Sequence, residues 1–200
     1  MTFQNQIDFF KNEILKEITK TRFEHSLRVA KIAKDLSIKH GYNNPEKAYL
    51  AGIVHDITKQ KKNEFHIEIF NKYNFNYSKL PYRAWHPFSG AIYLKVNYNL
   101  LDEEILSAVK NHTLGGSNLN LLDKILYVSD FLGSDYAYSH PELKDWVEIA
   151  SKDLNEGLVL KSRNIINELV SKKELIHPNT IETYNEAITS IKENHSYIEK

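Results

Sequence analysis

The stretch "AGIVHDITK", residues 51–59, is an apolar, helix-like run that ends in ionisable side chains. Ala51 to Val54 are small or apolar, and His55, Asp56 and Lys59 follow directly. Buried ionisable groups are costly unless they are paired or bind a metal. This triplet is therefore either a structural ion pair at the end of a buried helix or part of a site.

Helical periodicity extends from this stretch in both directions. Before it, apolar residues recur every three or four positions, which places them on one face of a helix; they are Ile7, Phe10, Ile14 and Ile18, then Phe23, Leu27, Ala30, Ala33 and Leu36. Asn44 followed by Pro45 is typical of a helix start. Helical patterns recur at about 63–72, 86–97, 102–112, 118–132, 142–170 and 178–193. We predict an all-α single domain.

The composition excludes several classes of protein. At 200 residues, 42% hydrophobic and 26% charged, the chain is typical of one globular domain. Its net charge of zero argues against a nucleic-acid binder. No apolar run approaches the ~18 residues of a membrane span, and the N-terminus lacks a signal-peptide pattern. The absence of cysteine fits a cytoplasmic protein and means that nitrogen and oxygen atoms must hold any metal.

Four histidines and two aspartates lie beside or within the apolar segments. They are His25, His55, Asp56, His86, His112 and Asp130. Residues on separate helices converge in the interior of a bundle, and imidazole with carboxylate suits iron, manganese, zinc or cobalt. Six ligands fit two ions bridged by one carboxylate. Taken singly, His86 before Pro87 also fits a helix cap, and Asp130 fits a salt bridge with Lys124 or Lys59.

A site with two divalent ions and two carboxylates is cationic and attracts phosphate. Two ions lower the pKa of a water between them and stabilise the attacking and leaving oxygens. Lys59 and Arg28 are candidates to hold phosphoryl oxygens, and Arg22 shares the helix face of His25. Thr113 either orients substrate or supports His112. We expect the other histidines at the surface; they are His40, His66, His140, His177 and His195.

The order of these residues resembles the HD-domain superfamily of metal-dependent phosphohydrolases. The segments "RFEHSLRVA" (22–30), "AGIVHDITK" (51–59), "WHPFSGA" (85–91), "LLDKILYVSDF" (121–131) and "HPNTIETYN" (177–185) together resemble the bacterial YqeK family. That family hydrolyses diadenosine tetraphosphate symmetrically to two ADP at a di-iron centre. The resemblance implies the six residues above as metal ligands, with Asp56 bridging and Lys59 near the phosphates. It also implies one HD domain over 1–200, with its metal-binding core at about 20–135 and C-terminal helices at about 142–193.

The chain departs from that family at two places. The family pattern has Gly-Arg after its His-Thr pair, where this chain has Gly115 and Gly116, and "DFLGSDYAY" (130–138) lacks a family Glu-Pro and an arginine. We hypothesise that the backbone N–H groups of Gly115 and Gly116 approach a phosphate instead. Other functions stay open: a nucleotidase, a dNTPase, a signalling-nucleotide phosphodiesterase, or a metal-bearing nucleotide sensor with little turnover. The apolar faces expected at 142–193 pack either internally or in a homodimer.

Overall fold

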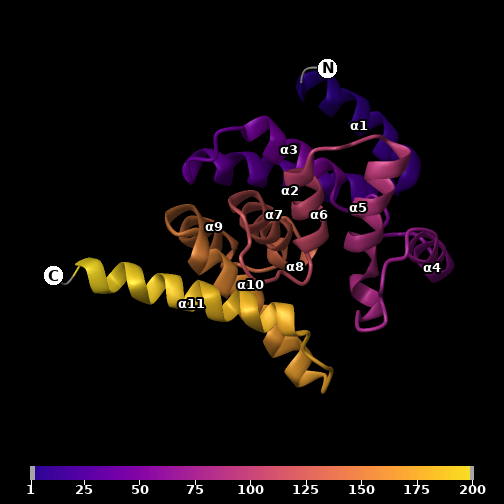
Figure 1. The fold of residues 1–200 in the computed structure, drawn as a ribbon. Coiled ribbons are helices and arrows are strands. Elements are labelled where there is room, and N and C mark those ends of the chain that lie inside the picture. Colours follow the sequence, from indigo (N-terminus) through magenta and orange to yellow (C-terminus); the bar gives the residue numbers. More distant parts are fainter. Residues whose placement is uncertain (1–2, 199–200) are drawn as a thin grey trace.

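The computed structural model describes residues 3–198, with side chains as far as residue 194, and every regular element in that range is helical (Figure 1). The elements are α1 (Phe3–Glu17), α2 (Lys20–Lys39), α3 (Pro45–Val54), α4 (Asn63–Lys72), the 3₁₀ turn η1 (Tyr82–Ala84), α5 (Trp85–Asn97), α6 (Glu103–Asn111), α7 (Leu121–Leu132), α8 (Asp135–Tyr138), α9 (Leu143–Lys152), α10 (Leu154–Ser171) and α11 (Pro178–Ile198). The predicted all-α class is confirmed. Over the described residues, no helix has both the length and the apolar character that a membrane crossing requires.

Helix α7 is central to the packing, since it contacts α2, α3, α6 and α10. One cluster of buried apolar side chains runs from Ile7 on α1 to Ala187 on α11. Leu126 and Tyr127 of α7 lie within it and are fully buried. The helix that carries Asp130 is thus held on several sides, which fixes where that side chain points.

Helices α2 and α3 approach each other more closely than any side chain would allow. A Cβ atom added at Gly52 would lie 2.4 Å from the Cα atom of Ala30. The absence of a side chain at Gly52 therefore lets the two backbones meet. The same contact brings the end of α3, where His55 follows, against the middle of α2.

The helical pattern expected at 142–170 is interrupted. Asp153 is extended (φ −140°, ψ 116°), and its carboxylate accepts a hydrogen bond from the N–H of Asn155, which caps α10. The break changes the direction of the chain, and α9 and α10 pack against each other. Gly157 lies close to Val128 and Ala150, where an added Cβ would lie 3.0 Å from each. The capping bond of Asp153 and the close contact at Gly157 thus explain why one continuous apolar pattern forms two helices.

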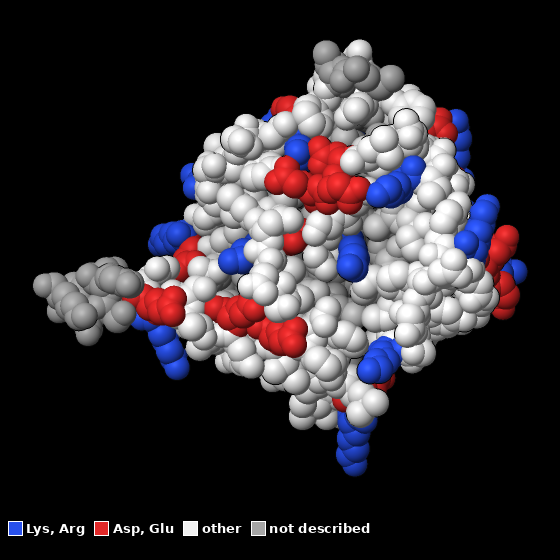
Figure 2. Space-filling view, viewed as in Figure 1, with Lys and Arg blue, Asp and Glu red and all other residues white. Residues whose placement is uncertain are grey.

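The surface carries its charges in scattered groups. On the face in Figure 2, lysines and arginines stand apart from one another, and one cluster of acidic side chains lies on the upper half. Helix α11 packs on α10 and then extends beyond the rest of the molecule towards the C-terminal end (Figure 1).

Candidate metal centre

Four histidines each have their Nδ1 atom held by a main-chain carbonyl oxygen. The pairs are His55 with Gly52 (2.7 Å), His112 with Val109 (2.6 Å), His86 with Arg83 (3.1 Å) and His25 with Gly133 (3.1 Å). A carbonyl oxygen only accepts, so Nδ1 carries the proton in each ring. The four Nε2 atoms therefore present lone pairs, which is the arrangement of metal-binding histidines.

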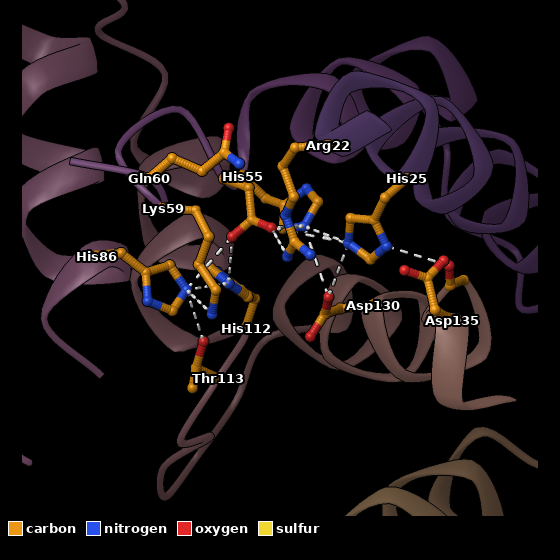
Figure 3. Close-up of polar contacts among 12 residues, drawn as sticks. Arg22, His25, His55, Lys59, Gln60, His86, His112, Thr113, Asp130 and Asp135 are labelled. Atoms are coloured by element: carbon orange, nitrogen blue, oxygen red, sulfur yellow. Dashed lines mark hydrogen bonds and ion pairs between the residues drawn. The ribbon is translucent and has the colours of Figure 1, made fainter. Parts of the chain in front are cut away.

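The ends of helices place most of these rings. His55 directly follows α3 and His112 directly follows α6, and each ring bonds back to a carbonyl three residues earlier. His86 is the second residue of α5, and His25 lies in the second turn of α2. Figure 3 shows His86 and Thr113 at one end of the site and His25 at the other.

Asp56 divides its two carboxylate oxygens between two pairs of histidines. Oδ2 lies 3.2 Å from Nε2 of His55 and 3.7 Å from Nε2 of His25. Oδ1 lies 3.3 Å from Nε2 of His86 and 3.5 Å from Nε2 of His112. One carboxylate thus faces two separate groups of nitrogen atoms, as a bridging ligand would.

Asp130 adds an oxygen to only one of these groups. Its Oδ1 atom lies 3.3 Å from Nε2 of His25 and 3.5 Å from Nε2 of His55. The first group is therefore His25, His55, Asp56 and Asp130, and the second is Asp56, His86 and His112. His25, His55 and Asp56 each offer one ligand atom, and these three atoms lie within 4.8 Å of one another. The same holds for Asp56, His86 and His112.

The donor atoms fit bound cations better than they fit one another. Nε2 of His25 lies 3.3 Å from Nε2 of His55, and Nε2 of His86 lies 3.1 Å from Nε2 of His112. When both rings of a pair are neutral and carry their proton on Nδ1, neither pair has a proton to share. Oδ1 of Asp56 is fully buried and has no hydrogen-bond partner among the described residues. Facing lone pairs and an unpaired buried oxygen are costly unless a cation lies between them.

The pKa shifts describe the same charge pattern. Burial raises the pKa of Asp56, but the charge on His55 and the surrounding imidazoles outweigh it and hold that pKa well below the usual range. Burial lowers the pKa of His86 to about 3, so this ring is neutral. Burial also disfavours charged His55, yet Asp56 and Asp130 raise its pKa to about 9. A divalent ion bound there would replace that proton.

The model of the HD domain family matches residues 22–133, a range that contains all six candidate ligands. This chain belongs to the HD domain family. Proteins with an HD domain are metal-dependent phosphohydrolases, and this chain is an enzyme of that class.

Related proteins match this HD-family chain along most of its length. It is 29% identical over 174 residues to the symmetrical bis(5'-nucleosyl)-tetraphosphatase of Bacillus subtilis, covering 86% of this chain and 92% of that one. It is 32% identical to the protein of the same name from Halalkalibacterium halodurans, covering 86% and 91%. The crystal structure of an HD superfamily hydrolase from Clostridium acetobutylicum, described as involved in NAD metabolism, is 30% identical, with a TM-score of 0.83 over 92% of this chain and 97% of that one.

A cavity of about 930 Å³ opens beside the candidate ligands of the HD domain. His25, His112 and Asp130 line one end, and α10 together with Lys172, the residue that follows it, lines the other. From Lys161 to Lys172 an α-helix rises by roughly 16 Å. The cavity is therefore long enough for a substrate that extends well beyond its reacting phosphate.

Three of the expected substrate-binding residues line the metal end of this cavity: Arg22, Lys59 and Thr113. Nζ of Lys59 lies 3.3 Å from Nε2 of His86, and Oγ1 of Thr113 lies 3.2 Å from the same atom. The guanidinium of Arg22 reaches between the histidines and pairs with Oδ2 of Asp56 (Figure 3). Two cations and a hydroxyl thus stand where a phosphate would meet the candidate ligands.

The other expected substrate-binding residues are engaged elsewhere. Arg28 donates from Nε to the carbonyl of Gly133 (3.1 Å) and from Nη2 to Asp135 (2.5 Å). The N–H of Gly115 donates to the carbonyl of Asn111, and the N–H of Gly116 donates to Oγ1 of Thr183 on α11. Both amides that we expected to approach a phosphate already have acceptors, Gly115 in its own turn and Gly116 on α11. The contact of these three residues with a phosphate stays a prediction.

Sequence reasoning missed Lys161 on α10. Its ammonium is buried and donates to Asp130 and to the carbonyl oxygen of His112. The signal was present: Leu154, Gly157, Leu158 and Lys161 follow the spacing of one helix face, so a lysine stands in an apolar stripe.

The surface position expected for His66 is wrong. This residue is 4% exposed, and its Nδ1 atom lies 2.7 Å from Oγ of Ser89. Ser89 in turn bonds the hydroxyl of Thr58, which donates to the carbonyl of His86. His66 therefore belongs to a buried polar network behind the site. The side chain of His195 lies outside the described residues.

Proposed function

We propose that this HD-family enzyme hydrolyses diadenosine tetraphosphate symmetrically to two molecules of ADP. The observation that carries the proposal is the position of Asp56, whose two oxygens face two separate groups of imidazole nitrogens beside one long cavity. The names of the Bacillus and Halalkalibacterium relatives support the choice of substrate.

In this proposal the residues hold two divalent metal ions, and iron is the metal that the family resemblance implies. The first ion is held by His25, His55, Asp56 and Asp130, and the second by Asp56, His86 and His112. Bound there, such ions supply a nucleophile from water at neutral pH and neutralise phosphoryl oxygens. A set of nitrogen and oxygen donors also accepts manganese, cobalt or zinc.

The side chains at the cavity mouth would bind and orient the phosphates. Lys59 and Arg22 offer positive charge, and the guanidinium of Arg22 offers a planar fork that matches two phosphate oxygens. The hydroxyl of Thr113 lies on the His86 side of the site and would fix one phosphoryl oxygen. Holding the reacting phosphate against these groups restricts its orientation, which lowers the entropic part of the barrier.

Helix α10 would accommodate a nucleoside beyond the phosphates. Ile165 gives this part of the cavity an apolar patch, and Asn164 and Asn167 give it side-chain amides. Tyr136 also lines it and donates a hydrogen bond to Oδ1 of Asn164 (3.1 Å). Apolar surface with a few oriented polar groups is the usual composition of a small-molecule pocket.

The location and the oligomeric state of the protein are also predictions from the sequence. The lack of cysteine supports a cytoplasmic location. A homodimer stays a prediction, to be measured by light scattering of the purified protein.

The test is a product assay with anaerobically purified, iron-loaded protein and diadenosine tetraphosphate. We expect ADP as the sole nucleotide product, because symmetrical cleavage divides the four phosphates equally. ATP with AMP would contradict symmetrical cleavage. No turnover would contradict the proposed substrate, and a panel of mononucleotides, dNTPs and cyclic dinucleotides then identifies another. Asp56→Asn is the matched control, since it removes the bridging charge and keeps the side-chain volume.

A further inference from the structure

Lys161 is a buried cation whose three ammonium protons all have acceptors. Nζ donates to the carbonyl oxygen of His112 (2.7 Å), the carbonyl oxygen of Tyr127 (2.8 Å) and Oδ2 of Asp130 (2.9 Å). An ammonium group has three donors and no acceptor, so its hydrogen-bonding capacity is filled. The residue is 4% exposed, and Nζ also lies 4.1 Å from the centre of the Tyr127 ring.

Two of these three acceptors belong to candidate metal ligands, one from each group. Asp130 faces His25 and His55, whereas His112 faces Oδ1 of Asp56 with His86. Lys161 therefore links the two groups from behind. The two residues that it joins come from different elements, the turn after α6 and helix α7.

The bond to Asp130 also decides how that carboxylate is presented. Lys161 occupies Oδ2, and Oδ1 is the oxygen that lies 3.3 Å from Nε2 of His25. A carboxylate with one oxygen fixed in this way offers a metal a single oxygen. Without the ammonium, the side chain is free to rotate about its Cβ–Cγ bond and its second oxygen loses its partner.

We propose that Lys161 is a positioning residue of the metal centre, which fixes Asp130 as a one-oxygen ligand and sets the spacing between the two ion sites through the backbone of His112. The inference rests on the metal centre of the proposed function. Lys161 lies outside residues 22–133, so α10 completes a site whose candidate ligands all come from the matched HD domain.

Two other roles would place a lysine here. A purely structural ion pair would stabilise the packing of α10 on α7 without affecting metal binding. A competing cation would weaken metal binding, because it repels the ions and draws charge from Asp130. These roles differ in what happens to metal affinity when the ammonium is removed: no change for the first, tighter binding for the second, and weaker binding for a positioning residue.

The experiment measures Mn²⁺ binding to metal-stripped protein by equilibrium dialysis, with electron paramagnetic resonance of the bound ions to detect spin coupling between neighbouring Mn²⁺. The variants are Lys161→Met, Lys161→Arg and, as matched control, Lys172→Met. Lys172 directly follows the same helix and lines the same cavity, but it is exposed and pairs with Glu168. We expect a Kd for Mn²⁺ roughly 10- to 100-fold weaker in Lys161→Met, which is the usual effect of losing a group that orients a ligand, with loss of the spin-coupled signal. Lys172→Met should bind as the wild type does.

Lys161→Arg keeps the fold testable if Lys161→Met does not fold, because it retains the charge beside Asp130. Its planar guanidinium cannot direct three hydrogen bonds from one nitrogen atom, so we expect weaker Mn²⁺ binding than in the wild type. Wild-type affinity, or tighter binding, in the folded Lys161 variant overturns the inference. If the wild type itself binds no Mn²⁺, the proposed metal centre fails; if it binds two ions and the variant equals it, this inference alone fails.

Discussion

The Nε2 atoms of His25 and His55 lie 3.3 Å apart, although the residues are 30 positions apart in the chain and belong to different elements. Each ring is held from behind by a main-chain carbonyl, so neither can turn away to relieve the contact of the two lone pairs. When both rings are neutral, the fold thus brings together donor atoms that repel one another. A cation between them removes that repulsion, which means that metal binding and stability are coupled.

The first prediction follows from this coupling. Adding Mn²⁺ or Fe²⁺ to metal-stripped protein should raise the melting temperature, since a ligand that binds only the folded state stabilises it by about 2.7 kcal/mol at 100 times its Kd. Asp56→Asn should remove most of the rise, because Asp56 contributes to both groups. Differential scanning fluorimetry with and without metal measures this.

Asp135→Asn is the control for that measurement. Its carboxylate also lines the cavity, but it is 80% exposed and pairs with Arg28 rather than with the histidines. If Asp135→Asn and Asp56→Asn lose the metal-induced rise in melting temperature equally, the ions bind nonspecifically to acidic side chains and not at the proposed centre.

The second prediction separates phosphate binding from metal binding. Lys59 reaches the site from the cavity mouth, and its ammonium lies 3.3 Å from Nε2 of His86. Lys59→Met should raise KM for diadenosine tetraphosphate about 10- to 100-fold, the loss expected for a hydrogen bond to a charged group. Metal content, measured by elemental analysis, should stay at the wild-type value. Lys61 lies two positions after Lys59 and pairs with Glu17, so Lys61→Met should leave KM unchanged.

The third prediction concerns the contact that brings α2 and α3 together. Gly52→Ala should gain about 1 kcal/mol from helix propensity, but the added Cβ would lie 2.4 Å from the Cα of Ala30. Because backbone cannot rotate away, overpacking of about 1–3 kcal/mol outweighs that gain. The helices should separate and carry His55 away from His25. We expect lower stability in urea unfolding together with weaker Mn²⁺ binding.

Gly116→Ala provides the comparison. An added Cβ there meets its nearest neighbour, Cδ2 of Leu119, at 3.6 Å, an ordinary van der Waals distance. The free energy of unfolding should change by no more than about 0.5 kcal/mol. Equal unfolding free energies for the two variants would refute the argument from the α2–α3 contact.

The sequence was sufficient for most of the helices and for the six candidate ligands whose donor atoms lie together. His55 and His112 could be placed because each ends an apolar helical pattern, where a polar side chain has to turn inward or cap. The position of Lys161 could be suspected from its apolar stripe, but its acceptors could not, since two of them are main-chain carbonyls, one in the turn after α6 and one on α7. Pairing across the fold is set by packing, which periodicity does not encode.

The fate of Gly115 and Gly116 illustrates the same limit. Two adjacent glycines are compatible with a phosphate-binding loop, and nothing in the local sequence argues against it. In the structure, Thr183 of α11 accepts the Gly116 N–H and lies where a side chain at Gly115 would be. A helix more than sixty residues away in the chain supplies the acceptor of the Gly116 amide, so the local pattern could not settle the role of that amide.

The last prediction uses the buried network behind the site. Burial lowers the pKa of His66, so the folded protein favours the neutral ring. The unfolded chain takes up protons near the ordinary value of ~6.5, before the folded chain does. The stability that this ring provides is therefore fully present above that value and is lost as the pH falls below it towards the lowered pKa of the folded state.

His66→Gln keeps a polar side chain beside Ser89 and does not titrate. Urea unfolding of chelator-treated protein should lose more free energy between pH 7.5 and 5.5 in the wild type than in His66→Gln. Equal losses would show that His66 is protonated in the folded state as readily as in the unfolded one.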